Sequence, residues 1–559
     1  MESRDDLKSI LPYLPLLLRS SSLFWPPPVV EALKELSRGP RHSNVDTGEV
    51  LFIAISDIRS SLCLSESSLA ESTADGYSIF FDDLISRDEA SKWFEDVVPG
   101  LASLLLRFPS LLEDHYEKAD GGVVRGVHTG LRLLESQEPG VVLLSQELVG
   151  ALIACSFFCL FPTRYRGAKH LPRINFDHLF ANLYDTYDEK LEHKLKCIVH
   201  YFGRICSSTP MNNVSFERKF LPGEHDCRFW SESYVSLCPF EVFKSGFIED
   251  QSREALEVDF ANKYIGGGAL SRGCVQEEIR FMINPELIAA LLFLPAMEDN
   301  ESIEIIGTER FLNYTGYASS FRFCGDYVDE KGIDHLGRRK TRVVAIDALH
   351  SPGKRQYTLE CLLREINKAF CGFSDQANHH HQQFSQASSP RECWRNNGDQ
   401  EDLCGILTDN LSRVEHPSSS VQAMEGSCDN LLRNTRHMNE NCELPETRLE
   451  IGIATGNWGC GAFHGNPELK AMLQWIAASQ AMRPFISYYT FDLEALNLLD
   501  QVVQWIISHE WTVGDLWDMV VDYSSQRLRG ETHLGFFNWL LPSLHHSSES
   551  SAMLDDSCP

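Results

Sequence analysis

Three consecutive glycines, Gly266, Gly267 and Gly268, are followed at residues 276–278 by Gln, Glu and Glu, and this arrangement constrains the fold more than any other feature of the chain. Residues 256–261 form a short apolar run typical of a strand, and a Glu pair is typical of the first turn of a helix. Because glycine has no Cβ, we expect the three backbone amides to be uncovered and able to bind an anion. A strand, a glycine loop and a helix in this order predict an α/β fold, and two carboxylic acids beside an anion site suggest glycoside chemistry on a phosphorylated sugar.

The chain is long and acidic. Its 559 residues exceed the size of one compact core, so we expect several units, and favour two with a large insertion. The 50 basic and 79 acidic residues give a formal net charge of −29. A net anionic surface repels nucleic acid at long range, so direct nucleic-acid binding is not expected, and any attraction for a polyanionic substrate must be local.

Cysteine spacing and hydropathy argue against other classes. The 17 cysteines include no Cys-x-x-Cys pair, which disfavours a zinc ribbon and a redox dithiol, so we expect neither a metal nor a cofactor. The amino terminus lacks the features of a secretory signal, so we expect an intracellular protein with reduced thiols. The most apolar window, residues 141–161, is interrupted early by Ser145, Gln146 and Glu147, and therefore predicts a buried helix rather than a membrane span.

Hydrophobic periodicity divides the chain into five parts. Residues 1–205 predict an N-terminal all-helical accessory domain, which we expect to pack without taking part in chemistry. Short β-type runs alternate with helices in residues 206–373 and 448–544, which predict the two parts of one α/β catalytic domain ending in helices. Residues 374–447 are too polar to fold and predict a disordered insertion, and residues 545–559 predict a flexible tail.

Polar residues follow the strand predicted before the three glycines. Asp259 and Asn262 lie where this strand ends, the position at which open α/β sheets present ligand-binding groups, and we expect them to fix ribose hydroxyls. Glu277 and Glu278 are adjacent, so on a helix they point about 100° apart and cannot flank one glycosidic bond as an ordinary carboxylate pair does. One should transfer protons while the other positions the substrate.

A second glycine-rich loop precedes a predicted helix at residues 467–480. Its candidate binding residues are Gly456, Asn457, Gly459, Cys460, Gly461, Ala462 and Phe463. Asn466 and Pro467 are typical of a helix start, so the amides of this loop would face a second phosphate position. A thiol nucleophile at Cys460 is the alternative, but no histidine has a diagnostic spacing from it.

The first motif resembles the signature of the poly(ADP-ribose) glycohydrolases, in which three glycines are followed after six to eight residues by Gln-Glu-Glu. The resemblance continues through Tyr314 and Tyr317 and through residues 454–461, and the amino-terminal third is similar to that of plant-type members. It implies a macrodomain-like mixed sheet between helices. It also implies an O-glycosyl hydrolase that cleaves ribose–ribose bonds of poly(ADP-ribose) and releases ADP-ribose without a metal.

The resemblance also implies residue roles. Glu278 would be the acid/base and act through an oxocarbenium-like state, Glu277 would hold ribose hydroxyls, and Gln276 would support the site. The second loop, Cys460 included, would bind the diphosphate. The other binding residues that it implies are Ile248 and Glu249 at the adenine edge, Tyr317 in a clasp over the nucleotide, and Phe491 beside the adenosine.

Two alternatives remain open: a non-hydrolytic ADP-ribose reader on a macrodomain scaffold, and a hydrolase that removes single ADP-ribose units from proteins. The intact residues 276–278 favour hydrolysis, because a reader needs no acid/base. The resemblance implies poly(ADP-ribosyl)ated proteins as partners, a role in the DNA damage response, and residence in nucleus and cytoplasm. We expect a monomer with no membrane contact. The basic run at 338–342 is a nuclear address, a polymer-contacting patch or a solvated loop.

Overall fold

The structure is a computed structural model that describes residues 1–64, 68–122, 127–208, 210–223, 225–375 and 451–541. The described residues up to Ser374 and from Ile451 onward belong to one compact unit. The insertion predicted at 374–447 falls outside the described residues except for its first two positions, and the tail predicted at 545–559 falls outside them entirely.

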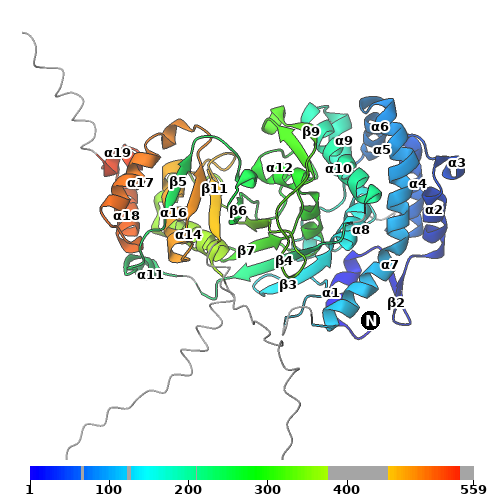
Figure 1. The fold of residues 1–559 in the computed structure, drawn as a ribbon, viewed down its shortest axis with the longest axis horizontal. Helices are drawn as coiled ribbons and strands as arrows, with labels where there is room; N and C mark the ends of the chain where they lie inside the picture. Colours follow the sequence, from blue (N-terminus) through cyan, green and yellow to red (C-terminus); the bar gives the residue numbers. More distant parts are fainter. Residues whose placement is uncertain (65–67, 123–126, 209, 224, 376–450, 542–559) are drawn as a thin grey trace, which may run out of the picture. The chain divides into compact units, whose positions relative to one another are not determined.

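The centre of the fold is one mixed eight-stranded sheet (Figure 1). In spatial order its strands are β3 (Gly140–Ser145), β4 (Asn213–Phe220), β7 (Glu301–Ile306), β10 (Arg342–Ala345), β6 (Ala255–Asp259), β11 (Gly452–Gly456), β12 (Ile486–Tyr489) and β5 (Phe240–Phe243). The strands from β10 to β5 pair in parallel, whereas β3, β4, β7 and β10 pair antiparallel. The parallel register places the ends of β6 and β11 side by side, and these ends are Asp259 and Gly456. The expectation of a mixed sheet between helices is confirmed.

Helices cover both faces of the sheet because alternate residues along its strands face opposite ways. On β10, Val343 and Ala345 join one hydrophobic core and Val344 joins the other. The first core includes α8 (Gln146–Phe157), α10 (Glu189–Ser207), α12 (Gln276–Ile283) and α13 (Ala290–Phe293). The second includes α11 (Cys227–Ser231), α14 (Leu359–Phe373), α16 (Pro467–Gln480), α17 (Leu499–Ser508), α18 (Val513–Arg529) and α19 (Phe536–Leu540).

The amino-terminal segment is mainly helical. Among the described residues, its remaining α-helices are α1 (Asp5–Ile10), α2 (Pro27–Ser37), α3 (Pro40–Ser43), α4 (Gly48–Ser61), α5 (Thr73–Ser78), α6 (Arg87–Lys92), α7 (Val98–Asp120) and α9 (Asp177–Asp185). It also contains a small hairpin, β1 (Leu17–Arg19) and β2 (Ser22–Phe24), and a second hairpin, β8 (Leu312–Thr315) and β9 (Arg322–Asp326), lies later in the chain.

The single buried helix expected at 141–161 is wrong in its first part. Residues Gly140–Ser145 form β3, which pairs with β4 and makes the amino-terminal segment contribute a strand to the sheet. The helix begins only at Gln146, because Ser145 accepts a hydrogen bond from the Leu148 amide and acts as its N-cap. The polar residues that interrupt the apolar window therefore mark a helix start.

The basic run at 338–342 is held in place by acidic partners rather than lying as a solvated loop. Arg338 is buried and pairs with Asp334 at 2.7 Å. Arg339 approaches Glu309 at 3.4 Å, and Arg342 approaches Glu254 at 3.3 Å. Each of these three guanidinium groups therefore forms an ion pair within the fold.

Two general features concern the described part of the chain only. Its helices include none that combines the length and the apolar character needed to cross a bilayer. No group of three His, Cys, Asp or Glu side chains there is arranged to hold a metal ion.

Candidate active site

The two glutamates are fixed to the glycine loop by backbone amides. Glu277 accepts hydrogen bonds from the amides of Asn262 at 2.9 Å and Gly266 at 2.6 Å. Glu278 accepts from the amides of Gly268 at 2.9 Å and Val275 at 2.8 Å. The second bond to Glu278 returns to the residue before α12, which is how a glutamate in the third position of a helix normally caps it. Both side chains are buried, so their orientation is set before any ligand binds.

The expectation of uncovered amides at 266–268 is wrong. Gly266 and Gly268 donate to the two glutamates, and the Gly267 amide donates to the Tyr264 carbonyl at 3.0 Å. The glycines serve a different purpose: a Cβ at Gly267 would lie 2.5 Å from Oε2 of Glu277 and 2.8 Å from Oε1 of Glu278. Glycine is required here because the carboxylates pack against the main chain, and the φ of +47° at Gly267 also favours it.

Gly273 has the same role, and sequence reasoning missed it. A Cβ at this position would lie 2.5 Å from Oε1 of Glu278. The signal available in the sequence was a fourth glycine, five residues after Gly268 and five before Glu278.

A buried carboxyl group lies beside Glu277. Asp259, at the end of β6, is 1% exposed, and within the described residues neither of its carboxyl oxygens has a hydrogen-bond partner. Burial raises the pKa of Asp259 to about 8. Burial, with the added repulsion of Asp259 and Glu278, raises the pKa of Glu277 well above its ordinary value. The site therefore holds carboxyl groups that favour the protonated form at neutral pH.

Gln276 connects the start of α12 to the end of β6. Its side-chain oxygen accepts from the Phe260 amide at 2.8 Å, and its nitrogen donates to the Val258 carbonyl at 3.0 Å. This pair of bonds fixes the helix start, and with it both glutamates, relative to the strand that carries Asp259.

The second loop differs from the first in the state of its amides. Within the described part of the chain, the amides of Gly461, Ala462 and Phe463 donate no hydrogen bond, and Gly461 and Ala462 are exposed. Asn457 holds the loop start by donating to the Thr490 carbonyl at 3.0 Å. Backbone amides with the capacity to bind an anion therefore lie in this loop rather than at the three glycines.

Cys460 is unsuited to act as a nucleophile. Burial raises the pKa of its thiol to about 12, which disfavours the reactive thiolate at neutral pH. Its sulfur lies 3.4 Å from the Trp458 carbonyl, within the turn of the loop.

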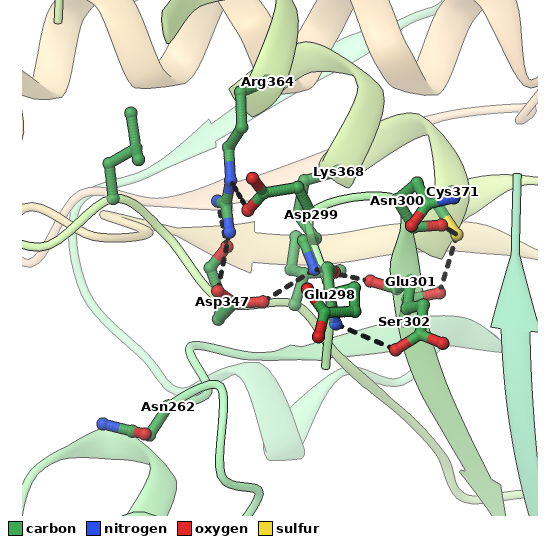
Figure 2. A network of polar contacts seen from close by, with 12 residues as sticks. Asn262, Glu298, Asp299, Asn300, Glu301, Ser302, Asp347, Arg364, Lys368 and Cys371 are labelled. Atoms are coloured by element: carbon green, nitrogen blue, oxygen red, sulfur yellow. Dashed lines mark hydrogen bonds and ion pairs between the residues drawn. The ribbon is translucent and has the colours of Figure 1, made fainter. Parts of the chain in front are cut away.

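A buried ionic network contacts the second loop through the Trp458 ring. Lys470 lies 3.8 Å from the centre of the Trp458 ring and pairs with Glu365 on α14. Figure 2 shows the neighbouring part of this network, where Asp347 after β10 binds Arg364 at 2.6 Å and Lys368 at 2.7 Å. These residues have no motif of their own, and sequence reasoning missed them.

Two aromatic residues implied by the resemblance, Tyr314 and Phe491, contact the segment that carries Ile248 and Glu249. The hydroxyl of Tyr314 donates to Glu249 at 2.6 Å, and the rings of Phe247 and Phe491 lie 6.4 Å apart. Phe491 is about half exposed, whereas Ile248 is buried in a small core cluster with Tyr489.

Tyr317 is also about half exposed and lies near the start of α12. Burial raises the pKa of Tyr317, the Gln276 amide lowers it, and the Glu278 charge adds to the rise. Its hydroxyl therefore faces the start of α12, where Gln276 and Glu278 lie.

Lys194 on α10 is an unexpected part of the site, since the helical segment was predicted to contribute packing alone. Its fully buried ammonium donates to the carbonyls of Gly268 at 3.2 Å, Ser271 at 2.8 Å and Gly273 at 2.6 Å. Burial lowers the pKa of Lys194 to about 8. The only sequence signal was a lysine adjacent to the apolar stripe of α10, at Leu191 and Leu195. The helical segment therefore holds the loop that carries both glutamates.

Comparison with known proteins assigns the family. Residues 227–498 match the family model "Poly (ADP-ribose) glycohydrolase (PARG), Macro domain fold", and residues 85–218 match the model of its helical domain. The chain is 58% identical over 549 residues to "Poly(ADP-ribose) glycohydrolase 1" of Arabidopsis thaliana, covering 97% of this chain and 98% of the relative. It is 50% identical over 552 residues to "Probable poly(ADP-ribose) glycohydrolase 2" of the same plant, covering 97% and 100%. A Caenorhabditis elegans protein, "Poly(ADP-ribose) glycohydrolase 2", is 27% identical over 353 residues, covering 60% and 58%. The chain therefore belongs to the poly(ADP-ribose) glycohydrolase family.

Proposed function

We propose that this family member hydrolyses the ribose–ribose O-glycosidic bonds of poly(ADP-ribose) and releases ADP-ribose, with Glu278 as the single acid/base. The supporting observation is the fixation of Glu278 by the amides of Gly268 and Val275 on a loop that also orients Glu277. Both carboxylates reach the same point at Gly267, so their nearest oxygens lie within about 5 Å of each other. This spacing leaves no room for the water that separates the two carboxylates of an inverting glycosidase, which needs roughly 6.5–9.5 Å.

The reaction then uses one side chain twice. Glu278 donates its proton to the leaving ribose oxygen as the bond from that oxygen to the anomeric carbon breaks, and an oxocarbenium-like centre forms. A water molecule adds to this carbon, and its proton returns to Glu278. Glu277 would position ribose hydroxyls, since the amides of Asn262 and Gly266 fix its carboxylate. Asp259, whose raised pKa favours the protonated form, would contribute to the same positioning.

The second loop is assigned to the diphosphate. Its free amides at 461–463 support this role, as does the pairing of β11, the strand before this loop, with β6. Tyr317 and Phe491, both about half exposed, are assigned to the nucleotide, and Ile248 and Glu249 to the adenine edge.

Poly(ADP-ribosyl)ated proteins are the partners through which such a substrate reaches the enzyme. We further propose a monomer that resides in the nucleus and cytoplasm and makes no direct contact with nucleic acid. The net charge of −29 supports the last point, because it repels a phosphate backbone at long range.

The test is to incubate the purified chain with labelled poly(ADP-ribose) and measure free ADP-ribose. Glu278→Gln should lower the rate at least a hundredfold while retaining polymer binding, and Glu117→Gln, at an exposed position on α7, should leave it unchanged. Binding without release by the wild type would favour the reader. Release of single units from mono-ADP-ribosylated proteins, with no action on polymer, would favour the hydrolase that removes single ADP-ribose units from proteins.

A further inference from the structure

A cavity of about 490 Å³ lies on the side of the glycine loop that faces the helical segment. One wall is the glycine loop, from Asn262 to Ser271, and the other is the turn from Gly167 to Arg173 between α8 and α9. We call it the basic cavity. Its lining includes the three glycines of the glycine loop but none of the residues of the second loop.

The walls of the basic cavity are fixed rather than adaptable. Buried Arg166 donates to the Pro172 carbonyl at 2.7 Å and to the Leu291 carbonyl at 2.5 Å, which holds the turn against the catalytic domain. The neighbouring amides of Ala296 and Met297 donate to the carbonyls of His170 and Lys263, at 2.9 and 2.8 Å. These two bonds place the backbones of His170 and Lys263 next to each other at the cavity rim.

The charge of the basic cavity is opposite to that of the chain. Among the described residues its lining includes His170 and Arg173 but no carboxylate, although the chain carries 79 acidic residues. Lys263 stands between the lining residues Asn262 and Tyr264. All three basic side chains are exposed, and in the described part of the chain none of them forms an ion pair. Basic side chains without a carboxylate partner, gathered around a preformed hollow, are suited to binding a phosphate-bearing ligand.

The basic cavity adjoins the reacting bond of the proposed reaction. Gly267 lines it, and the same residue packs against the oxygens of both Glu277 and Glu278. The free amides of the second loop follow the neighbouring strand β11, whereas one wall of the cavity belongs to the helical segment. A polymer cut at Glu278 has a released unit on one side of the bond and a retained unit on the other.

We propose that the basic cavity is a subsite for the retained ADP-ribose unit, the one that departs through its ribose oxygen, and that Arg173, Lys263 and His170 bind the pyrophosphate of that unit. This inference rests on the proposed function and identifies how the polymer, rather than its terminal unit alone, is recognised. It predicts that polymer binding and binding of free ADP-ribose depend on different basic side chains.

The test compares the double variant Arg173→Gln/Lys263→Gln with the control Arg41→Gln/Lys118→Gln, which removes two exposed charges from α3 and α7. For long labelled polymer, the cavity variant should raise KM about tenfold and reduce the slope of log KM against log salt concentration by about 1. Its kcat should stay within about twofold, and its Kd for free ADP-ribose should match that of the wild type. A KM equal to that of the control, or an equal loss of affinity for free ADP-ribose, would overturn the proposal.

A second measurement separates this inference from the activity. The same two substitutions are placed in the Glu278→Gln background, and Kd values for long polymer and for ADP-ribose are measured without turnover. A selective loss of polymer affinity supports the basic cavity whether or not the wild type hydrolyses the polymer. If the wild type releases nothing and this selective loss is still seen, the hydrolysis proposal fails and the subsite stands.

Discussion

Replacing Gly267 with alanine tests whether the glycine run exists to admit the carboxylates. The new Cβ would lie 2.5 Å from Glu277 Oε2 and 2.8 Å from Glu278 Oε1, where ordinary contact begins at 3.4 Å. At least one carboxylate would have to retreat by about 1 Å. It would then stretch or lose the hydrogen bonds that fix its direction.

The expected effect on catalysis can be separated from the cost of the backbone conformation. Alanine in a left-handed conformation costs roughly 1–2 kcal/mol. Gly353 supplies the control, since its φ of +53° is close to the +47° of Gly267 and a Cβ there meets nothing within 4 Å. Both variants should therefore lose similar stability from strain. Only Gly267→Ala should lose activity, by about a hundredfold, because a displacement of about 1 Å at a reacting group costs about that much.

The assay is release of ADP-ribose from labelled polymer at saturating substrate, combined with urea unfolding of both variants. Circular dichroism at the assay temperature establishes that each variant is folded. If folded Gly267→Ala retains kcat within threefold of Gly353→Ala, the carboxylates do not need the space, and the reasoning is wrong.

Three further predictions concern Lys194, Asp259 and Cys460. Lys194→Met should lower the free energy of unfolding by about 3 kcal/mol, because among described residues no other donor reaches the Ser271 and Gly273 carbonyls. The same substitution should lower kcat more than tenfold. The control Lys196→Met, on the same helix, should change neither quantity. Burial raises the pKa of Asp259 to about 8, so between about pH 4 and pH 8 the folded chain keeps a proton that the unfolded chain has lost. The free energy of unfolding should therefore fall as pH rises through this range. Urea titrations should show a shallower fall for Asp259→Asn. Cys460→Ser should keep kcat within about twofold, since burial disfavours the thiolate, and abolished turnover in a folded variant would restore the nucleophile alternative.

Local sequence patterns predicted the elements that carry the site. The apolar run before the glycines is β6, and α16 begins at Asn466 and Pro467 as expected. Helix caps and hydrophobic periodicity depend on residues that are close in the sequence, so a sequence pattern reveals them. Patterns of this kind could not reveal the contacts of Lys194, which lies 74 residues from Gly268 in the chain. Local patterns could not reveal the purpose of the glycines either. A Gly-Gly-Gly run permits close approach to the backbone, but it does not specify whether a ligand or a side chain approaches.

The pairing of β3 with β4 has a consequence for attempts to produce a minimal enzyme. A fragment starting after residue 205 would lack β3 and leave the long strand β4 at the margin of the sheet. Its unpaired N–H and C=O groups, beside buried Val214 and Phe216, would offer a template for joining other molecules edge to edge. Truncated material should therefore form insoluble aggregates, and soluble expression should require the amino-terminal residues on the same polypeptide.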